Sequence, residues 1–390
     1  MSVPCLSRYV QRWLAADPAR PARLDALAAV PADGLDLEAL LAELTTGAGL
    51  PWPRALRRLR NFLVCAIVRR DLGGQADLAE VVAAMTRFAD FAVRTAYAKL
   101  YAELVELHGE PLAADSGRRQ DMLVLAMGKH GGGELNVSSD IDLIFVYPED
   151  GETAAAAGQR GLSNHEFFIR LGKKLIAALS EVAEDGFVFR VDMALRPNGA
   201  SGPLAASLAM VEEYLMVQGR EWERYAWVKA RAVTGQAEDI AALDAIVRPF
   251  VFRRYLDFGV IDAIRSMHAQ IRAEVNRQER LHPERSHNVK LGRGGIREIE
   301  FIAQVFQLIR GGRDAALRER STRATLRTVA ERQLMTPETV QGLLDSYTFL
   351  RNLEHRLQYL DDAQTHTLPA NEDDRALVAR MAGLPDPAGL

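Results

Sequence analysis

Hydrophobic positions recur with the period of an α-helix over the first hundred residues of the chain. One apolar stripe ends near Gly73, and a longer one occupies positions 78–107 before Gly109 and Pro111 interrupt it. Side chains three and four positions apart lie on one face of a helix, while glycine and proline end helices readily. The pattern therefore predicts an N-terminal helical region over residues 1–114, closed by the polar stretch 115–119. The first stripe consists of Leu59, Phe62, Leu63, Ala66 and Ile67.

From position 121 the pattern changes to that of β-strands. An apolar run over 122–126 enters a glycine-rich turn, and the β-forming run 141–147 leaves it. An amphipathic stripe over about 167–179 then predicts a helix, and residues 187–195 alternate between apolar and polar side chains, as a half-buried strand does. Strand, glycine turn, strand, helix and strand together predict a compact α/β unit with a mixed sheet, over residues 115–247.

Beyond position 248 the apolar spacing is helical again, for example over 250–280 and 337–360. We therefore predict a C-terminal helical domain over 248–390. The predicted fold class is α+β and mostly helical, with a mixed sheet flanked by N-terminal and C-terminal helical regions. The loop 150–163, which is rich in alanine and glycine, is expected to be exposed.

The composition of the chain indicates which classes of binding partner and which cellular compartment to expect. Hydrophobic residues make up 48% of the 390 residues and charged residues 26%, which is typical of a globular protein. A formal net charge of −4 gives no electrostatic reason to expect nucleic acid as a partner. No apolar run approaches the ~20 residues that span a membrane, and Cys5 and Cys65 form no metal motif. We expect a cytoplasmic protein that binds neither nucleic acid nor membrane.

Two acidic residues stand in the strand pattern directly after the glycine turn. Asp140 and Asp142 are two positions apart, so their side chains share one face of a strand, about 7 Å apart at Cα. Carboxylates at this spacing suit hard cations such as Mg²⁺, which keep substrate phosphate oxygens as further ligands. The neighbouring turn offers backbone N–H groups to phosphate without obstruction by Cβ atoms. This combination favours a two-metal site for phosphoryl or nucleotidyl transfer.

A third acidic residue stands on the polar face of the 187–195 pattern. Asp192 shares that face with Arg190 and Arg196, so it is a candidate to complete a triad of metal-binding carboxylates. The alternative is that Asp192 pairs with one of these arginines in a solvated surface network. Alternation alone does not separate the two interpretations.

A basic, glycine-rich turn precedes a helix that is expected to begin near Ile296. Lys290 and Arg293 flank this turn, and the N-terminus of a helix attracts anions. Alternatively, Gly294 and Gly295 only allow a tight turn between packed helices. Both interpretations stay open.

Four blocks of the sequence together resemble one enzyme family. They are MGKHGGGELNVSSDIDLIFVYPEDGET from Met127, FVFRVDMALRPNGASGPL from Phe187, GREWERYAWVKARAV from Gly219 and KLGRGGIREIEFIAQ from Lys290. Their order and spacing resemble the N-terminal half of the bifunctional glutamine synthetase adenylyltransferase/adenylyl-removing enzymes. These enzymes belong to the DNA polymerase β-like nucleotidyltransferases, so the resemblance implies a nucleotidyltransferase-type sheet. Complete members carry two similar halves, and this chain is expected to be a fragment with one.

The resemblance implies roles for particular residues. Asp140 and Asp142 would bind the catalytic metals, two Mg²⁺ ions, with Asp192 as the third acid. Two positions depart from the family pattern: His130 replaces an apolar residue and Ala194 an arginine. The candidate residues for binding nucleotide or phosphate are Gly128, Lys129, Gly131, Gly132, Gly133, Ser139, Arg196, Lys290 and Arg293.

The resemblance also implies a reaction and partners. In the family, the N-terminal half removes AMP from a tyrosine of glutamine synthetase by Mg²⁺-dependent phosphorolysis, consuming phosphate and releasing ADP. Adenylylated glutamine synthetase and the PII signalling protein are the implied partners. Two alternatives stay open: ATP-dependent adenylylation of glutamine synthetase, and a docking or regulatory fragment without catalysis.

Overall fold

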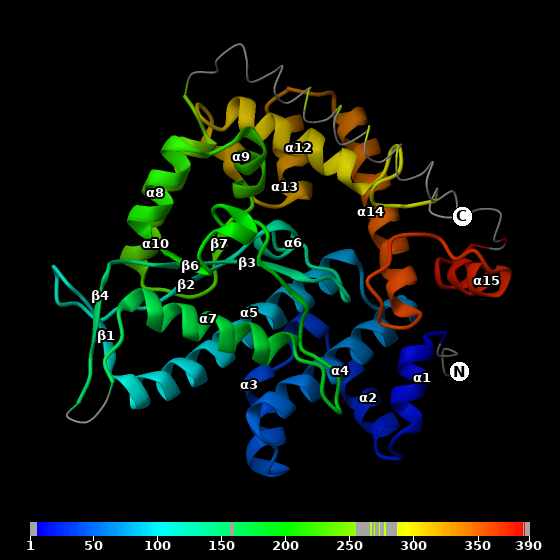
Figure 1. The fold of residues 1–390 in the computed structure, drawn as a ribbon. Coiled ribbons are helices and arrows are strands. Elements are labelled where there is room, and N and C mark those ends of the chain that lie inside the picture. The colour runs from blue at the N-terminus through cyan, green and yellow to red at the C-terminus, as the bar shows by residue number, and fades with distance from the viewer. Residues whose placement is uncertain are drawn as a thin grey trace.

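The computed structural model describes residues 6–156, 160–254 and 287–384, with the isolated positions 266, 269, 273, 277 and 386. Figure 1 shows a small sheet near the centre, with helices from both ends of the chain around it. Its elements are α1 (Arg8–Ala15), α2 (Arg20–Ala28), α3 (Leu37–Ala42), α4 (Trp52–Leu72), α5 (Leu78–His108), β1 (Glu110–Ala113), β2 (Leu123–Ala126), α6 (Gly128–Gly131), β3 (Ile141–Tyr147), β4 (Gly151–Ala154), α7 (Asn164–Ser180), β5 (Val191–Asp192), β6 (Ala205–Ser207), α8 (Leu208–Val217), α9 (Glu221–Trp227), β7 (Arg231–Ala232), α10 (Ala237–Val251), α12 (Ile296–Arg310), α13 (Thr322–Glu331), α14 (Pro337–Tyr359) and α15 (Glu372–Met381).

Strand β3 is the centre of a mixed sheet with the order β5-β3-β2-β7. It pairs antiparallel with β2, where Leu125 lies opposite Ile144. Its other edge pairs in parallel with β5 and then with β6. The mostly helical α+β fold with a mixed sheet is thereby confirmed, and β3 occupies the predicted positions 141–147.

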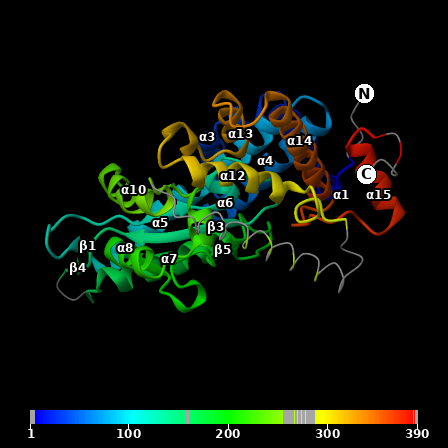
Figure 2. The same cartoon turned by 90° about the horizontal axis from the view of Figure 1, so that it is seen from above.

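The two faces of β3 pack against different groups of helices. Leu143 and Phe145 belong to a large core that also contains residues of α4, α5, α7, α12 and α14. Ile144 and Val146 point to a second core, formed with α8, α9 and α10. In Figure 2, helices lie on both sides of β3. Because both faces are covered, the strand is apolar at almost every position, and Asp142 is the exception.

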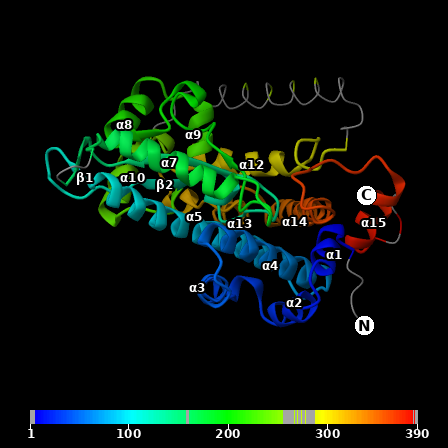
Figure 3. The ribbon, with the colours of Figure 1, turned by 60° about the horizontal axis from the view of Figure 1, so that its bottom comes forward.

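The helices at the two ends of the chain contact each other. The backbone N–H of Tyr9 in α1 donates to the carbonyl oxygen of Leu360, just after α14. Arg60 in α4 forms two hydrogen bonds to Asp362, at 2.7 and 2.9 Å, and both side chains are buried. Figure 3 shows α1 and α15 side by side. One hydrophobic core therefore joins the N-terminal helices, the sheet and the C-terminal helices; the domain boundaries at 114/115 and 247/248 stay predictions.

Three expectations from the sequence need correction. The alternating segment 187–195 contributes only the two residues of β5, because the N–H groups of Val188 and Phe189 both donate to the carbonyl oxygen of Leu179. This contact closes the end of α7, so that part of the segment cannot extend the sheet. The described part of the loop 150–163 is mostly exposed, as expected, but it contains a strand, β4, which pairs with β1. The sheet also includes the short strands β6 and β7, which follow the last strand that the sequence predicts.

The helix expected over 250–280 lies mostly outside the described residues. Among the helices that the structure describes, none is both long and apolar enough to cross a membrane.

Candidate active site

The parallel pairing of β3 with β5 brings two of the predicted acids together. Asp142 and Asp192 are direct partners in the register of the two strands. Asp140 stands just before β3, and the backbone N–H of Ile141 donates to the carbonyl oxygen of Arg190, 2.9 Å away. Arg190 and Arg196 donate to the carbonyl oxygens of Ser138 and Met193, and within the described part of the chain neither forms an ion pair with Asp192. The surface network considered for Asp192 is therefore wrong.

A cavity of about 550 Å³ opens beside Asp140 and Asp142, whereas Asp192 is not among its described lining residues. Of the predicted site residues, Gly128, Lys129, Ser139, Asp140, Asp142 and Lys290 line it. Four residues spaced three or four positions apart also line the cavity: Trp222, Tyr225, Ala226 and Lys229. Its other described lining residues are Leu195, Arg297, Glu300 and Gln304.

The surroundings of Asp142 disfavour the ionised form of its carboxyl group. Burial raises its pKa first, and the nearby charges of Asp140 and Asp192 raise it further, to about 7. Lys290 and Lys129 lower this pKa but do not restore it to the usual range. The negative charge of Asp142 is therefore disfavoured where it stands, and a proton or a bound cation would neutralise it.

The donor chemistry of the site suits Mg²⁺, although the acids do not form a closed set of ligands. Oδ1 of Asp140 accepts a hydrogen bond from Nε2 of Gln364 at 2.8 Å, and Oδ1 of Asp192 accepts one from the N–H of Ala194 at 2.7 Å. No group of three or more His, Cys, Asp or Glu side chains among the described residues is arranged to hold a metal ion. Magnesium commonly takes one or two carboxylates and completes its shell with water and substrate phosphates. Carboxylate oxygens with uncompensated charge meet that requirement.

The glycines of the turn serve two different purposes. Gly128 has a positive φ of 54°, and a Cβ atom there would lie 2.8 Å from Oδ2 of Asp142, so its missing side chain makes room for this carboxylate. A Cβ on Gly131 would lie 2.0 Å from the carbonyl oxygen of Lys229, so that glycine permits close packing of α6 against the end of α9. Gly132 and Gly133 also lie outside the described cavity lining. A phosphate-binding role for these three glycines stays a prediction.

Lys129 is held in the cavity by an acid from the distant helix α14. Its Nζ atom lies 3.0 Å from both carboxylate oxygens of Glu354, which is fully buried. Burial lowers the pKa of Lys129 to about 8, even though Glu354 counteracts that shift. His366 contacts the same carboxylate at 2.8 Å. The sequence did not indicate this partner, because 225 residues separate Lys129 from Glu354.

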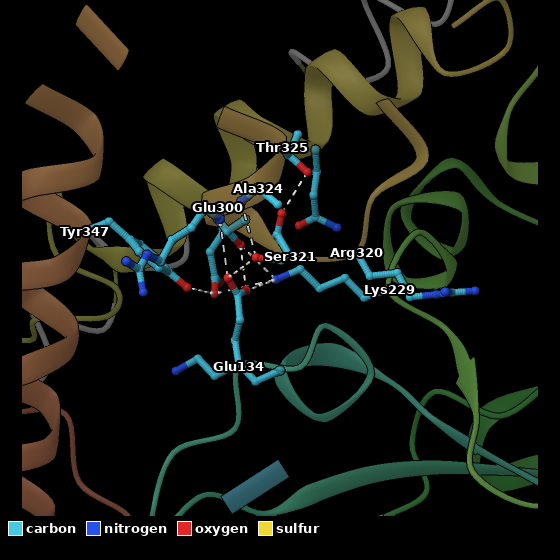
Figure 4. A network of polar contacts seen from close by, with 12 residues as sticks. Glu134, Lys229, Glu300, Arg320, Ser321, Ala324, Thr325 and Tyr347 are labelled. Carbon is cyan, nitrogen blue, oxygen red and sulfur yellow. Dashed lines mark hydrogen bonds and ion pairs between the residues drawn. The ribbon is translucent and has the colours of Figure 1, made fainter. Parts of the chain in front are cut away.

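Lys229 belongs to a second polar network, shown in Figure 4. Its Nζ atom lies 3.3 Å from Oε2 of Glu134, 3.1 Å from Oγ1 of Thr322 and 3.8 Å from Oε1 of Glu300. Ser321 also donates to Glu134, at 3.0 Å. The network ties α9, α12 and the start of α13 to the loop that leads into β3. Glu134, Glu300 and Gln304 carry no sequence motif that marks them in advance.

The basic turn before α12 has features of both interpretations, anion binding and a tight turn that glycine permits. Lys290 lines the cavity and acts electrostatically on Asp142, whereas Arg293 is exposed and is not among the described lining residues. Gly294 has a φ of 74°, and its N–H donates to Glu298 of the following helix. The turn therefore needs its glycine for backbone reasons and also carries a cation to the cavity. The anion-binding role of both basic residues stays a prediction.

The two departures from the family pattern have structural counterparts. His130 is buried, and its Nε2 atom lies 2.8 Å from Oδ1 of Asp90 in α5, outside the cavity lining. Ala194 is exposed, and its N–H holds Asp192. Arg196 is half-buried and is also outside the described cavity lining.

Comparison with known proteins gives two family matches. The family model described as glutamate-ammonia ligase adenylyltransferase matches residues 1–246. The model described as GlnD PII-uridylyltransferase matches residues 265–389.

Several similar proteins carry the name bifunctional glutamine synthetase adenylyltransferase/adenylyl-removing enzyme. One from Ralstonia nicotianae is 55% identical over 404 residues, which cover 98% of this chain and 42% of the relative. One from Burkholderia pseudomallei is 55% identical over 395 residues, with the same two shares. One from Neisseria meningitidis serogroup B is 52% identical over 330 residues, covering 85% of this chain and 36% of the relative. The chain thus spans about two fifths of the length of these relatives.

Proposed function

Because the chain belongs to the glutamate-ammonia ligase adenylyltransferase family, we propose that it removes AMP from adenylylated glutamine synthetase by phosphorolysis. An oxygen of inorganic phosphate attacks the phosphorus of the tyrosine-bound AMP, the bond from phosphorus to the tyrosine oxygen breaks, and ADP leaves. The tyrosine oxygen takes up a proton. The names of the similar proteins include an adenylyl-removing activity, and the sequence blocks resemble the N-terminal half of such enzymes.

The observation that carries the proposal is the cavity that Asp140 and Asp142 line, together with the register of β3 with β5, which makes Asp192 the strand partner of Asp142. Asp140, Asp142 and Asp192 would hold Mg²⁺, and the raised pKa of Asp142 supports this because a cation would relieve the charge. Bound Mg²⁺ supplies stabilisation of the charge on the phosphoryl oxygens.

The cations of the cavity support the same substrate class. Lys290, Lys129 and Arg297 line it opposite the acids, so they would orient phosphate oxygens and offset their charge. Inorganic phosphate is already an anion at neutral pH, so its attack needs no dedicated general base. The aromatic side chains Trp222 and Tyr225 offer surfaces on which a nucleobase or a tyrosine ring would stack.

The proposed partners are adenylylated glutamine synthetase and the PII signalling protein. The match of residues 265–389 to the PII-uridylyltransferase model supports the second partner. The composition supports a cytoplasmic location, without nucleic acid or membrane as a partner.

The names of the similar proteins also favour a second reaction, ATP-dependent adenylylation. The same acids and cations would serve it, because both reactions displace a group at the phosphorus of AMP. The two differ in the co-substrate that they consume: removal needs phosphate and releases ADP, whereas addition needs ATP and releases pyrophosphate.

The test incubates the chain with adenylylated glutamine synthetase, Mg²⁺ and phosphate, and measures ADP. The matched reaction supplies unmodified glutamine synthetase with ATP, and measures pyrophosphate. We expect phosphate-dependent ADP release, which Asp140→Asn abolishes. Pyrophosphate in the second reaction without ADP in the first would assign the chain to adenylylation. The absence of both products would favour the non-catalytic docking fragment.

A further inference from the structure

A second cavity, of about 470 Å³, shares a wall with the catalytic cavity. The shared wall is α9 with the residues that lead into β7: Tyr225 and Lys229 line the catalytic cavity, while Trp227, Ala230 and Arg231 line the second. The other described residues that line the second cavity are Leu125, Val228, Ala232, Ile240, Leu243, Asp244, Val247, Arg248, Phe252, Arg318 and Arg320.

The second cavity combines an excess of arginine with apolar walls. Four arginines and one acidic residue, Asp244, occur among the lining residues that the structure describes. Arg231 is neutralised, because both of its terminal nitrogens bond to Asp90 of α5, at 2.8 and 2.9 Å. Arg248, Arg318 and Arg320 have no carboxylate partner within the described part of the chain. Three positive charges are thus left for a single nearby aspartate.

Two of these arginines are held in place by the protein. Nε of Arg318 donates to the carbonyl oxygen of Gly311 at 2.7 Å, and Nε of Arg320 donates to that of Ala230, also at 2.7 Å. Both side chains are half-buried. A guanidinium that is anchored through Nε keeps its terminal nitrogens for another acceptor, and these nitrogens match the oxygens of a carboxylate or phosphate.

The apolar wall is also fixed by its neighbours. The ring of Phe252 lies under the guanidinium of Arg318, with 5.8 Å between Cζ and the ring centroid. Gly311 also lies close to this ring, since a Cβ atom there would come within 2.6 Å of it. A side chain at position 311 would therefore displace Phe252. The ring and the cation beside it form a preformed surface for a ligand with both apolar and charged parts.

We propose that this cavity binds a small organic anion with an apolar body. Its carboxylate or phosphate group pairs with Arg318 and Arg320, and its body packs against Trp227, Leu243 and Phe252. A larger cavity of about 850 Å³, beside α1 and α4, differs because its described lining holds five arginines and six acidic residues. Its arginines are already offset, so it lacks the excess of positive charge that selects an anion.

A ligand at Arg320 would act next to the network that holds Lys229. Arg320 is followed by Ser321 and Thr322, whose hydroxyl groups bond to Glu134, the acid that contacts Lys229 (Figure 4). Binding in the second cavity therefore bears on a residue of the catalytic cavity. This consequence for turnover rests on the proposed function, whereas the binding site itself does not.

The test uses the fluorescent probe 8-anilinonaphthalene-1-sulfonate, which joins an aromatic body to one anionic group. It is titrated against the chain and against Arg318→Gln, Arg320→Gln and the double variant. We expect about tenfold weaker binding for each single variant, because each removes a charge-assisted contact. Neutral N-phenyl-1-naphthylamine should bind the parent and the variants equally. Displacement of the probe by octanoate or by phenyl phosphate then shows which anionic group the cavity prefers.

Two controls locate the probe. Lys290→Gln, in the catalytic cavity, and Arg293→Gln, on the exposed turn, should bind the probe as the parent chain does. If Arg320→Gln does not fold, Arg248→Gln replaces it, because Arg248 is exposed and bonds to no other described side chain through an ion pair. Equal affinity in the parent chain and in the folded arginine variants would overturn the proposal. Loss of binding in Lys290→Gln alone would also overturn it.

Discussion

At the scale of one residue, the ionised carboxylate of Asp142 destabilises the folded protein. Its carboxylate is largely buried and faces two further acids, so the protonated form is favoured and its pKa rises to about 7. A folded-state pKa above that of the unfolded chain means that folding holds a proton. Proton binding by Asp142 therefore adds to the free energy of unfolding. This contribution is fully present below the pKa of the unfolded chain, near 4, and is lost as the pH rises through about 7.

We therefore predict that Asp142→Asn abolishes ADP release and yet stabilises the metal-free fold above pH 7. In the presence of a chelator, the parent chain should lose a few kcal/mol of unfolding free energy between pH 5 and 8, at about 1.4 kcal/mol for each unit of pKa shift. The variant should lack this part of the pH dependence. Thermal unfolding over this range measures it, with Asp345→Asn, on an exposed position of α14, as the matched control. A parallel pH dependence in parent and variant would contradict the environment assigned to Asp142.

Lys290 and Arg293 provide a matched pair, three positions apart in one turn. Lys290 lines the catalytic cavity, whereas Arg293 is exposed and outside the described lining. We predict that Lys290→Ala raises the KM for phosphate about tenfold, the size of one charge-assisted contact, while Arg293→Ala changes it less than about twofold. Both should keep the parent melting temperature. Equal effects of the two variants on the KM for phosphate would indicate that Arg293 also belongs to the phosphate site.

At the scale of elements, the junction of β2, α6 and β3 sets the geometry of the acids. The backbone N–H of Met127 donates to the carbonyl oxygen of Asp142 at 2.9 Å, which holds the end of β2 beside β3. Gly128 follows with its positive φ and leaves room for the Asp142 carboxylate. Helix α14 supplies Glu354 to the next residue, Lys129. Elements that are distant in the sequence, β3 and α14, thus contact the same short turn after β2.

We predict that Gly128→Ala lowers kcat at least tenfold and destabilises the fold by about 1–3 kcal/mol, because alanine is strained at this φ and its Cβ collides with Asp142. The control is Gly342→Ala inside α14, where a Cβ meets nothing within 4 Å. That change should stabilise the protein by up to about 1 kcal/mol and leave kcat alone, since alanine favours helix more than glycine does. Full activity of Gly128→Ala would show that the turn tolerates a side chain.

The sequence predicted elements best where the local pattern alone determines them. The helices near 52–72, 78–108 and 337–359 were confirmed, because their apolar residues repeat with a helical period. The strand 141–147 was confirmed because it is a short, nearly continuous run of β-forming residues. The strand around Asp192 was predicted too long, since the bonds of Val188 and Phe189 to Leu179 depend on where α7 ends. The pairing of Asp192 with Asp142, and the contacts of Lys129 and Lys229, depend on tertiary packing. No local pattern encodes them.

At the scale of the whole molecule, charged pairs buried between distant helices join the two ends of the chain. Asp71 in α4 accepts hydrogen bonds from Arg356 and Tyr359 of α14, at 2.8 and 2.7 Å for Nη2 and the phenol. These contacts lie within the core that also contains the sheet. The described part of the chain should therefore unfold as one cooperative unit.

We predict one unfolding transition in urea, with the same midpoint by circular dichroism and by tryptophan fluorescence. Asp71→Ala should lower the free energy of unfolding by about 3–5 kcal/mol, because it leaves the buried Arg356 without its carboxylate partner. The control, Arg12→Ala, removes an exposed ion pair with Asp361, which is worth about 0–1 kcal/mol. Two separate transitions, or equal shifts for the two variants, would show that the ends of the chain fold independently.

The pair between Arg60 and Asp362 has a consequence for synthesis on the ribosome. The two residues are 302 positions apart, and a nascent chain grows at about 5–20 residues per second, so about 15–60 s separate their appearance. During that interval α4 has been made, but the carboxylate that neutralises its buried guanidinium has not. The N-terminal helices therefore leave the exit tunnel with apolar faces that nothing yet covers. We expect them to be a binding surface for chaperones until α14 and α15 emerge.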